Sequence, residues 1–599
     1  MSQIQSVQKY SDQIMLWLSE LNYSQCFFLG GGNCMHLVDS ANKFFNTTPV
    51  IHEVSAGIAA EYFTDLSDNA QRAFSVVTAG PGVTNIVSAV SAAWLESRPL
   101  LIIAGQAKTS NLSTNGARQI GHQEIDAVSI MKSMTKAAIQ ISSPISKNQF
   151  QSIVLKQFEG RPGPVFIEFC LDITSMPVLK SDSPNESSIK NTIKEKIIES
   201  EVETIVDLVS KSKKPLFLFG GGLSRDSTKK HAKKLEGLGI PIAVTWNGAD
   251  RISADYKYYC GRPNTYGMRF SNVIIQECDL LITFGTRLGI QQIGFAWEEF
   301  ASKASIVQIE IDESELTKGF PQVDYAIQHD ANNFLDVLCQ ELNPELINNL
   351  NSWHEYISKV KEILPTVEKN YVPINQYVEP YELISELNTL SKPNDVWVSC
   401  SSGGTFTAFM QVVQPKKGQK IISSKGLASM GFGLAGAIGA SLSNPNSRII
   451  LTEGDGGFAQ NMQELGTVAI NKLNIKIFLM SNDGYASIRT SQKSYFGGNY
   501  LGCDSKTGLM LPEWESIAKS YGLDFINVNS INLWNERMLD LFNSPLPTLF
   551  IINIDPEQPY LPKVTSRILE DGSMVSNPIN KMYPPLNSEV EKLLGFKID

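Results

Sequence analysis

An aspartate between glycines ends one apolar run of the chain, and an asparagine follows the next run. Asp455 lies in ILTEGDGGFAQ, and twenty-six residues separate it from Asn482 in FLMSNDGYASI. The first run reads as a strand ending at Gly454, residues 458–473 read as a helix, and the second run reads as another strand. Parallel strands of a βαβ unit end at the same sheet edge. We therefore expect Asp455 and Asn482 to lie together.

The residue types at this edge indicate a site for a charged ligand. Carboxylate, side-chain amide and backbone carbonyl oxygens suit a hard divalent cation such as Mg²⁺. Glycines allow backbone N–H groups to approach an anion, and a helix N-terminus favours negative charge. The stretch thus predicts a diphosphate held by a divalent cation. Two tight turns with Gly and Asn in left-handed conformations are the alternative interpretation.

The elements around this stretch predict an α/β fold. Short apolar runs, most of them ending in Gly, Ser or Asp, alternate with helix-length segments, as in βα units with strands buried on both faces. Residues 179–201 and 342–376 read as linkers, the second as a helix followed by an extended strap. Residues 8–32 and 380–404 both read as helix, strand and Gly-rich turn. We expect three doubly wound parallel-sheet domains at residues 1–180, 200–345 and 375–560, with a C-terminal strap or lid at residues 561–599.

Composition excludes some classes of function. The formal net charge of -10 argues against nucleic acid or an anionic membrane as the main partner. No apolar run approaches the length of a bilayer span, and the N-terminus lacks the apolar core of a signal peptide. The eight cysteines include no C-x-x-C pair, which favours reduced thiols and a cytoplasmic location.

Three stretches together resemble the thiamine-diphosphate-dependent enzymes, and the acetolactate synthase-like group in particular. Gly454-Asp455-Gly456 with Asn482 at this distance is similar to the family's cofactor motif. PVIHEVSAGIAAEYF and SVVTAGPGVTNIVSAVSAAWLESRPLLIIAGQ are similar to its pyrimidine-binding domain, as is GRPGPVFIEFCLDI. The resemblance covers nearly the whole chain and implies the order pyrimidine-binding, central and diphosphate-binding domain.

The resemblance implies roles for individual residues. Asp455, Asn482 and the backbone carbonyl of Gly484 would bind Mg²⁺. Glu53 stands at the catalytic glutamate and would hydrogen-bond the aminopyrimidine ring of thiamine diphosphate, which supplies the thiazolium ylid. Alone, a Glu before a helix is more simply an N-terminal charge.

Other cofactor contacts follow from the same resemblance. Met430 would support the bent cofactor from beneath, although a Met in such a sequence is more often plain core. The carbonyl of Ala428 would accept from the aminopyrimidine. The remaining implied cofactor-binding positions are Gly31, Gly80, Asn85, Ser402, Gly403, Gly454, Gly456, Gly457 and Tyr485.

In the resembling enzymes a residue pair from the first domain reaches the reacting carbon. Here RQIGHQEIDAVSI supplies His122 and Gln123. His122 is a candidate proton shuttle or a structural histidine, and Gln123 is the stronger active-site candidate. Glu53 and Asp455 fall in different domains, and the family places its cofactor between subunits. The resemblance therefore implies a homodimer at least, with a tetramer left open.

Departures from the family patterns bear on the substrate. Pyruvate decarboxylase-like enzymes have paired histidines and a Glu after the metal-binding Asn, whereas this chain has a single His122 and Ile488. Acetolactate synthases have an Arg-containing stretch after FG-x-R, where FGTRLGIQQIG places Gln291. Ser491 stands at the position of their aromatic residue, and GGGNC (residues 30–34) puts small residues at the pocket mouth. These changes favour a bulkier, neutral acceptor.

We therefore expect a carboligase that decarboxylates a 2-keto acid, pyruvate first among them, and adds the acyl unit to a carbonyl acceptor such as a keto-sugar nucleotide. Acetolactate synthase proper, a thiamine-dependent C–C hydrolase or lyase, and a non-catalytic homologue are the alternatives. The intact Glu53, Asp455 and Asn482 argue against the last of these. Gly-rich turns in the central domain, such as FGGGLSRDS, leave FAD binding and a purely structural role equally open.

Overall fold

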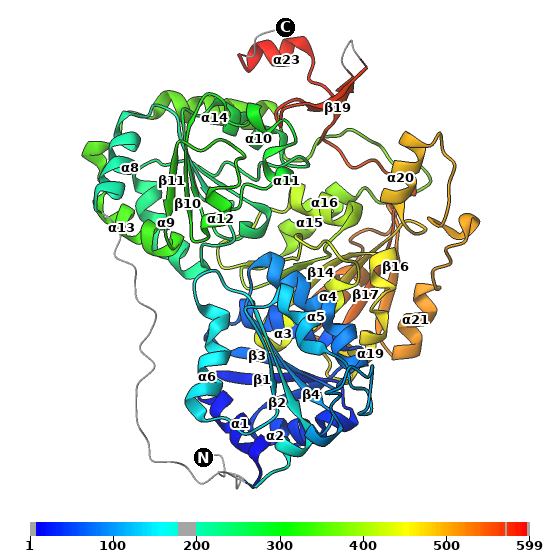
Figure 1. The fold of residues 1–599 in the computed structure, drawn as a ribbon. Coiled ribbons are helices and arrows are strands. Elements are labelled where there is room, and N and C mark those ends of the chain that lie inside the picture. The colour runs from blue at the N-terminus through cyan, green and yellow to red at the C-terminus, as the bar shows by residue number, and fades with distance from the viewer. Residues whose placement is uncertain (1–7, 178–198, 569–571, 596–599) are drawn as a thin grey trace.

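The computed structural model describes residues 8–177, 199–568 and 572–595, which form three parallel sheets of six, five and six strands (Figure 1). This confirms the predicted α/β class. Residues 179–198 of the first predicted linker lie outside the described residues, and residues 199–201 begin helix α8.

The first and third sheets share one topology. In the first domain the strands run β2-β1-β3-β4-β6-β5, and in the third β13-β12-β14-β15-β17-β16. Numbered within each domain, both orders are the same, so the similarity of residues 8–32 and 380–404 extends across two whole sheets. The first-domain elements are α1 (Tyr10–Ser19), β1 (Tyr23–Phe28), α2 (Met35–Phe44), β2 (Asn46–Pro49), α3 (Glu53–Leu66), β3 (Arg72–Val77), α4 (Pro81–Glu96), β4 (Leu100–Gln106), α5 (Ala127–Met131), β5 (Ala137–Ile141), α6 (Lys147–Leu155), β6 (Pro164–Cys170) and α7 (Leu171–Thr174).

The third domain repeats this arrangement. Its elements are α15 (Pro380–Leu390), β12 (Val396–Ser399), α16 (Gly403–Val412), β13 (Lys420–Ile422), α17 (Phe432–Ser443), β14 (Ile449–Gly454), α18 (Asp455–Phe458), α19 (Leu465–Ile470), β15 (Ile475–Ser481), α20 (Ala486–Tyr495), α21 (Trp514–Tyr521), β16 (Asp524–Val528), α22 (Glu536–Asn543) and β17 (Thr548–Asn553). Its first two helices, α15 and α16, pack against each other as α1 and α2 do in the first domain.

The central domain is a smaller sheet ordered β11-β10-β9-β7-β8. Helix α14, which lies in the second predicted linker, packs Trp353, Ile357 and Val360 into this domain's core, and irregular backbone follows it as predicted. The elements are α8 (Glu199–Lys211), β7 (Pro215–Phe219), α9 (Arg225–Gly237), β8 (Ile242–Val244), α10 (Arg269–Glu277), β9 (Leu280–Phe284), α11 (Ile290–Ile293), β10 (Ser305–Glu310), α12 (Glu313–Leu316), β11 (Tyr325–Gln328), α13 (Ala331–Glu341) and α14 (Asn351–Ile363).

The C-terminal segment runs from the third domain to the central one (Figure 1). Its Ile579 and Leu594 are buried in the central domain's core, and Val564 N–H donates to Thr265 at 2.8 Å. It therefore forms a strap over the central domain. Its elements are β18 (Lys563–Val564), β19 (Ser566–Ile568), β20 (Met574–Ser576), β21 (Met582–Tyr583) and α23 (Ser588–Leu593).

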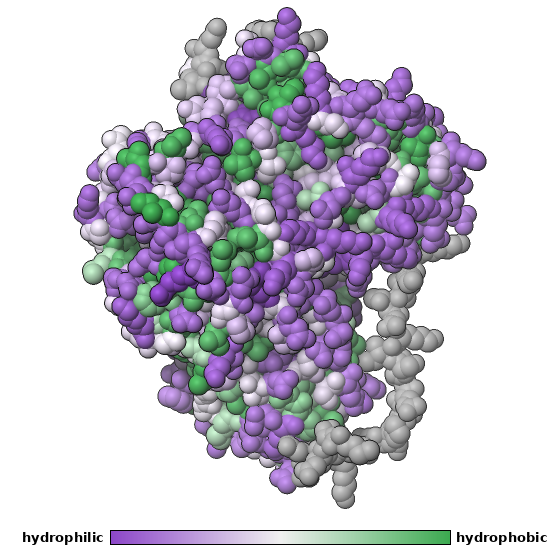
Figure 2. Space-filling view, turned by 180° about the vertical axis from the view of Figure 1, so that it is seen from behind, coloured by the Kyte–Doolittle hydropathy of each residue, from purple (hydrophilic) through white to green (hydrophobic). Residues whose placement is uncertain are grey.

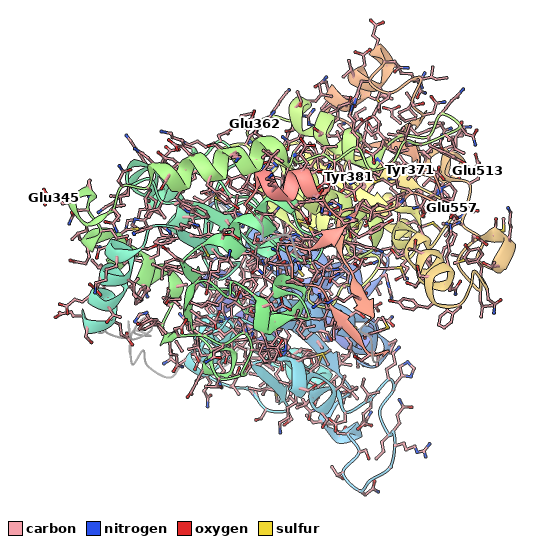
Figure 3. All side chains as sticks on the ribbon, turned by 90° about the horizontal axis from the view of Figure 1, so that it is seen from above. Glu345, Glu362, Tyr371, Tyr381, Glu513 and Glu557 are labelled. Atoms are coloured by element: carbon pink, nitrogen blue, oxygen red, sulfur yellow. The ribbon has the colours of Figure 1, made fainter. Side chains whose placement is uncertain are left out.

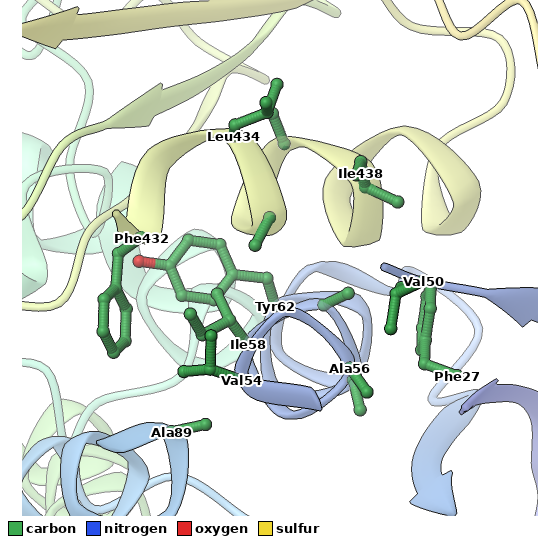
Figure 4. Packing of buried hydrophobic residues seen from close by; sticks show 14 of the residues in the cluster. Phe27, Val50, Val54, Ala56, Ile58, Tyr62, Ala89, Phe432, Leu434 and Ile438 are labelled. Atoms are coloured by element: carbon green, nitrogen blue, oxygen red, sulfur yellow. The ribbon is translucent and has the colours of Figure 1, made fainter. Parts of the chain in front are cut away.

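Equivalent helices of the first and third domains pack against each other. Helix α3 crosses α17 and packs against it, and the Tyr62 ring fills the space beside Phe432 (Figure 4). A Cβ on Gly436 would lie 2.4 Å from the Tyr62 ring, and one on Gly439 only 2.1 Å from the Ala59 carbonyl oxygen. The small residues of α17 thus allow the two backbones to approach, and the contact joins both domains in one core.

The single helix predicted over residues 458–473 is wrong. The structure has the short α18, a 3₁₀ turn at Met462–Glu464, and then α19. The buried Glu464 carboxylate accepts from the backbone N–H groups of Ile51 and His52, each at 3.0 Å. The helix is interrupted where Glu464 makes this contact with the first domain. The spacing of apolar residues in the sequence carries no information about such a tertiary contact.

On the face seen in Figure 2, hydrophilic residues predominate and apolar side chains form small separate groups, as on most folded proteins. Among the helices of the described residues, none has the length and apolar character needed to cross a membrane. All eight cysteines are buried and free, in agreement with the predicted reduced thiols.

A buried carboxyl in the first sheet gives a stability prediction. Burial raises the pKa of Glu168 from 4.5 to about 7, against hydrogen bonds from Gln140 and Gln106 at 2.8 and 3.1 Å. Because the folded pKa is raised, the stabilising contribution is complete below the unfolded pKa and is lost as pH rises through about 7. Glu168→Gln should remove this loss of stability, because the new side chain does not ionise. The exposed Gln140 amide can rotate so that its oxygen accepts a hydrogen bond from the new amide.

Chemical denaturation at a series of pH values measures the effect. Between about pH 5 and pH 8 the parent should lose about 2–3 kcal/mol of unfolding free energy that the variant retains. Parallel stability curves for the two proteins would contradict the assignment.

Candidate active site

Asp455 and Asn482 lie side by side at the carboxyl edge of the third sheet. Strands β14 and β15 pair in parallel to Gly454 and Met480. The Asp455 carboxylate is 1 % exposed, and its Oδ2 accepts from the N–H groups of Asn482 at 2.9 Å and Gly484 at 3.2 Å. Burial raises the pKa of Asp455 to about 6, although these backbone donors lower it. The spacing in the sequence therefore predicted the meeting of the two residues.

Two further oxygen atoms, those of the Asn482 side chain and the Gly484 carbonyl, lie beside this carboxylate. The Asn482 side-chain oxygen lies 3.1 Å from the Gly484 carbonyl oxygen and 3.3 Å from Asp455 Oδ1. Three acceptors repel one another unless the amide turns to donate or a cation lies between them. Neighbouring ligands of an octahedral Mg²⁺ at about 2.1 Å are about 3 Å apart, which fits this set. No group of three or more His, Cys, Asp or Glu suited to a metal occurs in the described residues, so a cation here would use amide and carbonyl oxygens.

A buried arginine that no sequence pattern singles out supports this loop. Arg489, on α20, is 6 % exposed. Its Nη2 donates to the backbone carbonyl of Asn482 at 2.9 Å, and its Nη1 lies 3.5 Å from Asp504. Tyr485 N–H also donates to the Cys503 carbonyl at 2.8 Å. The segment after α20 therefore fixes the turn that carries the oxygens.

Two helices begin at the same edge. Ser402 is the N-cap of α16 and Gly454 that of α18, and neither helix start has a side-chain cap. The first N–H groups of a helix lack partners within it, which leaves those of Gly403 and its neighbours available to an anion. The Ser401 hydroxyl is buried and has no hydrogen-bond partner among the described residues. This chemistry fits a diphosphate.

The first domain contributes the predicted glutamate. Glu53 is the first residue of α3 and is 6 % exposed, and its Oε2 accepts from Asn85 Nδ2 at 3.0 Å. Gly31 lies at the turn after β1, where a Cβ would be 2.5 Å from Thr78. The edge of this sheet thus holds a buried carboxyl with one donor already on it, and the turn after β1 packs so closely on Thr78 that only glycine fits there.

The loop carrying His122 and Gln123 passes over this edge. Gly80 has a φ of +64°, and a Cβ there would lie 2.6 Å from the Gln123 carbonyl oxygen, so only glycine fits. His122 is exposed, and its carbonyl accepts from Asn33 Nδ2 at 3.1 Å. The loop therefore lies at the same edge of the first sheet as Glu53. We call the predicted site residues of the first domain and those of the third domain the two half-sites.

Glu124 shapes that loop and was not selected from the sequence. Its carboxylate accepts from the backbone N–H groups of Ser113, Ile120 and Gly121, at 2.5, 2.8 and 2.9 Å. These donors, that of Ser113 foremost, lower the pKa of Glu124. The ionised carboxylate thus holds both ends of the turn that presents His122.

Non-glycine residues with left-handed backbone occur in three site loops. Gln123 has φ +61°, Ala428 +56° and Asp483 +61°. Such conformations persist where surrounding structure imposes them, and they cluster at functional sites. Met430, beyond Ala428, is 36 % exposed, and Asn461 Nδ2 donates to the Gly431 carbonyl at 2.7 Å. The turn is therefore anchored while Met430 remains accessible.

The two half-sites use equivalent loops of the repeated topology. Glu53 begins α3 and Met430 precedes α17, its counterpart, while Gly80 follows β3 and Asp455 follows β14. Within the described chain, no hydrogen bond or ion pair joins the predicted residues of one half-site to those of the other.

The positions relevant to substrate choice divide between two places. Ile488 and Ser491 lie on α20 and are exposed. Gln291, on α11, lines a cleft of about 940 Å³ where the central domain meets the other two. Arg287 and Lys425 also line it, and neither forms an ion pair among the described residues.

Comparison with known protein families shows which family this chain belongs to. Three family models match in order: the thiamine pyrophosphate enzyme N-terminal TPP binding domain over residues 8–130, the central domain over residues 202–338, and the C-terminal TPP binding domain over residues 402–552. The chain belongs to the thiamine pyrophosphate enzyme family. It is therefore a thiamine-diphosphate-dependent enzyme of the decarboxylase and carboligase type.

Curated relatives from this family are acetolactate synthases. The probable acetolactate synthase large subunit of Methanococcus aeolicus is 28% identical over 527 residues, covering 84% of this chain and 85% of that protein. The isozyme 2 large subunit of Escherichia coli is 28% identical over 516 residues, covering 84% and 88%. Acetolactate synthase 1 of Oryza sativa is 27% identical over 578 residues, covering 93% and 86%. The relationship is distant and leaves the substrate open.

Proposed function

We propose that this enzyme decarboxylates a 2-keto acid, with pyruvate as the first donor to test, and transfers the acyl unit to a carbonyl acceptor. The convergence of the Asp455, Asn482 and Gly484 oxygens carries the proposal, because it provides for Mg²⁺ at a sheet edge that also suits a diphosphate. The reaction releases CO₂ and forms one C–C bond, and the acceptor oxygen gains a proton.

Each residue would have a distinct task. Thiamine diphosphate supplies the carbanion chemistry when bound. Asp455, Asn482 and Gly484 would hold the metal, and the N-termini of α16 and α18 the diphosphate. Glu53 would exchange a proton with the aminopyrimidine ring, with Asn85 fixing its carboxyl through the 3.0 Å hydrogen bond. Gln123 and His122, on the loop held by Glu124, would meet the substrate.

The acceptor we propose is large and neutral at its reacting end, such as a keto-sugar nucleotide. Gln291 offers a neutral amide where acetolactate synthases have an Arg-containing stretch. Ser491 is small and exposed on α20, so it leaves more room than the aromatic residue of those enzymes. Acetolactate formation from pyruvate alone is the alternative.

A direct assay separates these possibilities. The purified enzyme is incubated with pyruvate, thiamine diphosphate and Mg²⁺, alone and with a panel of carbonyl acceptors that includes keto-sugar nucleotides. We expect CO₂ release and a ligated product detected by mass when a bulky acceptor is present. Acetolactate from pyruvate alone would establish the alternative, and absence of CO₂ with every acceptor would reject both.

We further propose that the working unit is at least a homodimer, in which Glu53 of one subunit faces Asp455 of the other. Within the described part of one chain, no hydrogen bond joins the predicted site residues of the first domain to those of the third. Apolar side chains beside both of them remain exposed, among them Ile51 at 52 %, Met430 at 36 % and Ile488 at 47 %. A second subunit would cover such a surface.

A flavin in the central cleft is a second candidate. The cleft of about 940 Å³ is lined by the Gly-rich strand ends at Gly221 and Gly285, and its size suits a dinucleotide. Lys425 lies 4.9 Å from the Phe406 ring centroid, and burial lowers its pKa. Together with Arg287 it provides positive charge for a diphosphate linkage.

Absorbance spectroscopy tests the flavin. Protein purified with its ligands should absorb near about 450 nm, the usual flavin band, and release the flavin on denaturation. Arg287→Ala should lower flavin retention and leave thiamine diphosphate binding unchanged. A colourless protein that does not retain added FAD would reject this candidate.

A further inference from the structure

A buried carboxylate of the third domain holds the backbone that leads into Glu53. Glu464 lies in the 3₁₀ turn before α19 and is 0 % exposed. Its Oε1 accepts from the N–H groups of Ile51 and His52, each at 3.0 Å. Its Oε2 accepts from Thr467 Oγ1 at 2.8 Å. Both oxygen atoms are therefore bonded, and the carboxylate is fixed in its own domain while it holds the other.

The two backbone donors are the last N–H groups before the first residue of α3. His52 is the N-cap of α3 and makes no side-chain cap hydrogen bond, and Glu53 follows it as the first helical residue. The approach to this helix is thus held by a neighbouring domain instead of by its own cap. A carboxylate at a helix N-terminus also interacts favourably with the helix dipole. The place at which α3 begins, and with it the position of the Glu53 carboxyl, therefore depends on Glu464.

The same turn contacts the half-site of the third domain. Asn461, directly before the turn, is 4 % exposed, and its Nδ2 donates to the carbonyl of Gly431, the residue after Met430, at 2.7 Å. Its Oδ1 lies 3.4 Å from His52 Nδ1. Figure 3, seen from above, and Figure 1 both show the first domain against the third. One short segment therefore touches both the approach to Glu53 and the turn that carries Met430.

We propose that Glu464 is a positioning residue for Glu53. It acts as a hydrogen-bond acceptor that sets the backbone at Ile51 and His52, and it exchanges no proton itself. The inference rests on the proposed function, in which Glu53 exchanges a proton with the aminopyrimidine ring. Proton transfer needs hydrogen-bond distance between the two groups. A displacement of the start of α3 by about 1 Å is therefore enough to lower turnover.

Two substitutions separate the position of this side chain from its charge. Glu464→Gln keeps its length, so the oxygen can still accept from Ile51 and His52 while the amide donates to Thr467 Oγ1. Glu464→Asp keeps the charge but is shorter by one methylene, about 1.5 Å, which draws the acceptor away from the two N–H groups. A positioning role predicts that Gln is tolerated and Asp is not. A role in proton transfer predicts the reverse.

Steady-state rates of CO₂ release at saturating thiamine diphosphate and Mg²⁺ measure the first outcome. We expect Glu464→Asp to lower kcat by about ten- to a hundredfold, the range for a small misplacement of a reacting group. Its KM for the keto acid should stay near the parent value, because the groups that meet the substrate are unchanged. Glu464→Gln should keep a kcat near that of the parent. A kcat as low in Glu464→Gln as in Glu464→Asp, or parent-like values in both, would overturn the inference.

Amide hydrogen exchange on the cofactor-free protein gives a readout that is independent of turnover. In the parent and in Glu464→Gln the N–H groups of Ile51 and His52 should be protected, because both are bonded to a buried acceptor. In Glu464→Asp they should exchange about tenfold faster or more, as expected when such a hydrogen bond is weakened. Parent-like protection of both amides in Glu464→Asp would contradict the inference.

Thr467→Val is the matched control. It removes the third hydrogen bond to the same carboxylate and leaves the bonds to Ile51 and His52 in place. We expect a lower melting temperature, with kcat and the protection of the two amides at the parent values. A loss of turnover equal to that of Glu464→Asp would show a general loosening of the turn and reject the specific role.

Failure of the proposed function gives a different pattern of results. If Glu53→Gln retained parent turnover, the role of Glu53 would be rejected, and with it the reason for positioning this residue. If Glu53→Gln were inactive while Glu464→Asp kept the parent kcat, the function would stand and the role of Glu464 alone would be rejected.

Discussion

Glu53→Gln should lower turnover by about two to four orders of magnitude, the range expected when a positioned proton-transfer group is lost. Gln has nearly the same shape and can still accept from Asn85, whose Nδ2 now donates to Glu53 at 3.0 Å. It cannot exchange a proton with the aminopyrimidine ring. Thiamine diphosphate and Mg²⁺ should bind with parent-like affinity, because their charged ends are held by the third domain.

The control for this variant is Glu61→Gln on the same helix. Glu61 is buried and paired with Arg98 at 2.9 Å, so its replacement should lower the melting temperature but leave turnover per folded enzyme nearly unchanged. Rates follow CO₂ release under saturating cofactor. Unchanged turnover in Glu53→Gln with cofactor still bound would remove the proposed role of Glu53.

Asp455→Ala should abolish formation of the holoenzyme. The variant lacks the only carboxylate of the proposed metal site, and also the acceptor for the N–H groups of Asn482 and Gly484. We expect binding of thiamine diphosphate to weaken by at least about a hundredfold. Equilibrium dialysis with Mg²⁺ measures this, and parent-like retention of the cofactor would contradict the metal site.

Mixing the two inactive variants tests the shared site. If Glu53 of one subunit faces Asp455 of the other, a heterodimer of Glu53→Gln and Asp455→Ala has one intact and one doubly altered site. Random exchange makes about half the dimers heterodimers, so about a quarter of parent activity should return. Sites contained within one chain would give no recovery, provided that mass spectrometry confirms subunit exchange.

Much of the architecture could be predicted because local patterns determine it. Runs such as RIILTEG and IKIFLMS are apolar throughout, as strands buried on both faces must be, and they form β14 and β15. Because the parallel strands of a βαβ unit end at the same edge of a sheet, the sequence predicts that Asp455 lies beside Asn482. Glu53 could be selected only through the resemblance, because one glutamate at a helix start has no distinctive local signal.

What could not be predicted depends on contacts between distant segments. The interruption before α19 follows from Glu464 binding the backbone of Ile51 and His52. Arg489 and Glu124 act on backbone carbonyl and N–H groups that every residue possesses, so no side-chain pattern reveals them. Tyr560 lies in a segment without periodicity, and only the structure shows that its ring packs against Gly404, where a Cβ would lie 2.0 Å from Cε2 and Cζ.

The common strand order of the first and third sheets has a consequence for how a pair of chains would be arranged. The two domains share one topology and pack through their equivalent helices α3 and α17, so their loops come in corresponding pairs. In the proposed mechanism one copy carries the carboxyl for proton exchange and the other the carboxylate for a cation. In the proposed dimer, four domains of one topology would come together, and each site would form where two unlike copies meet.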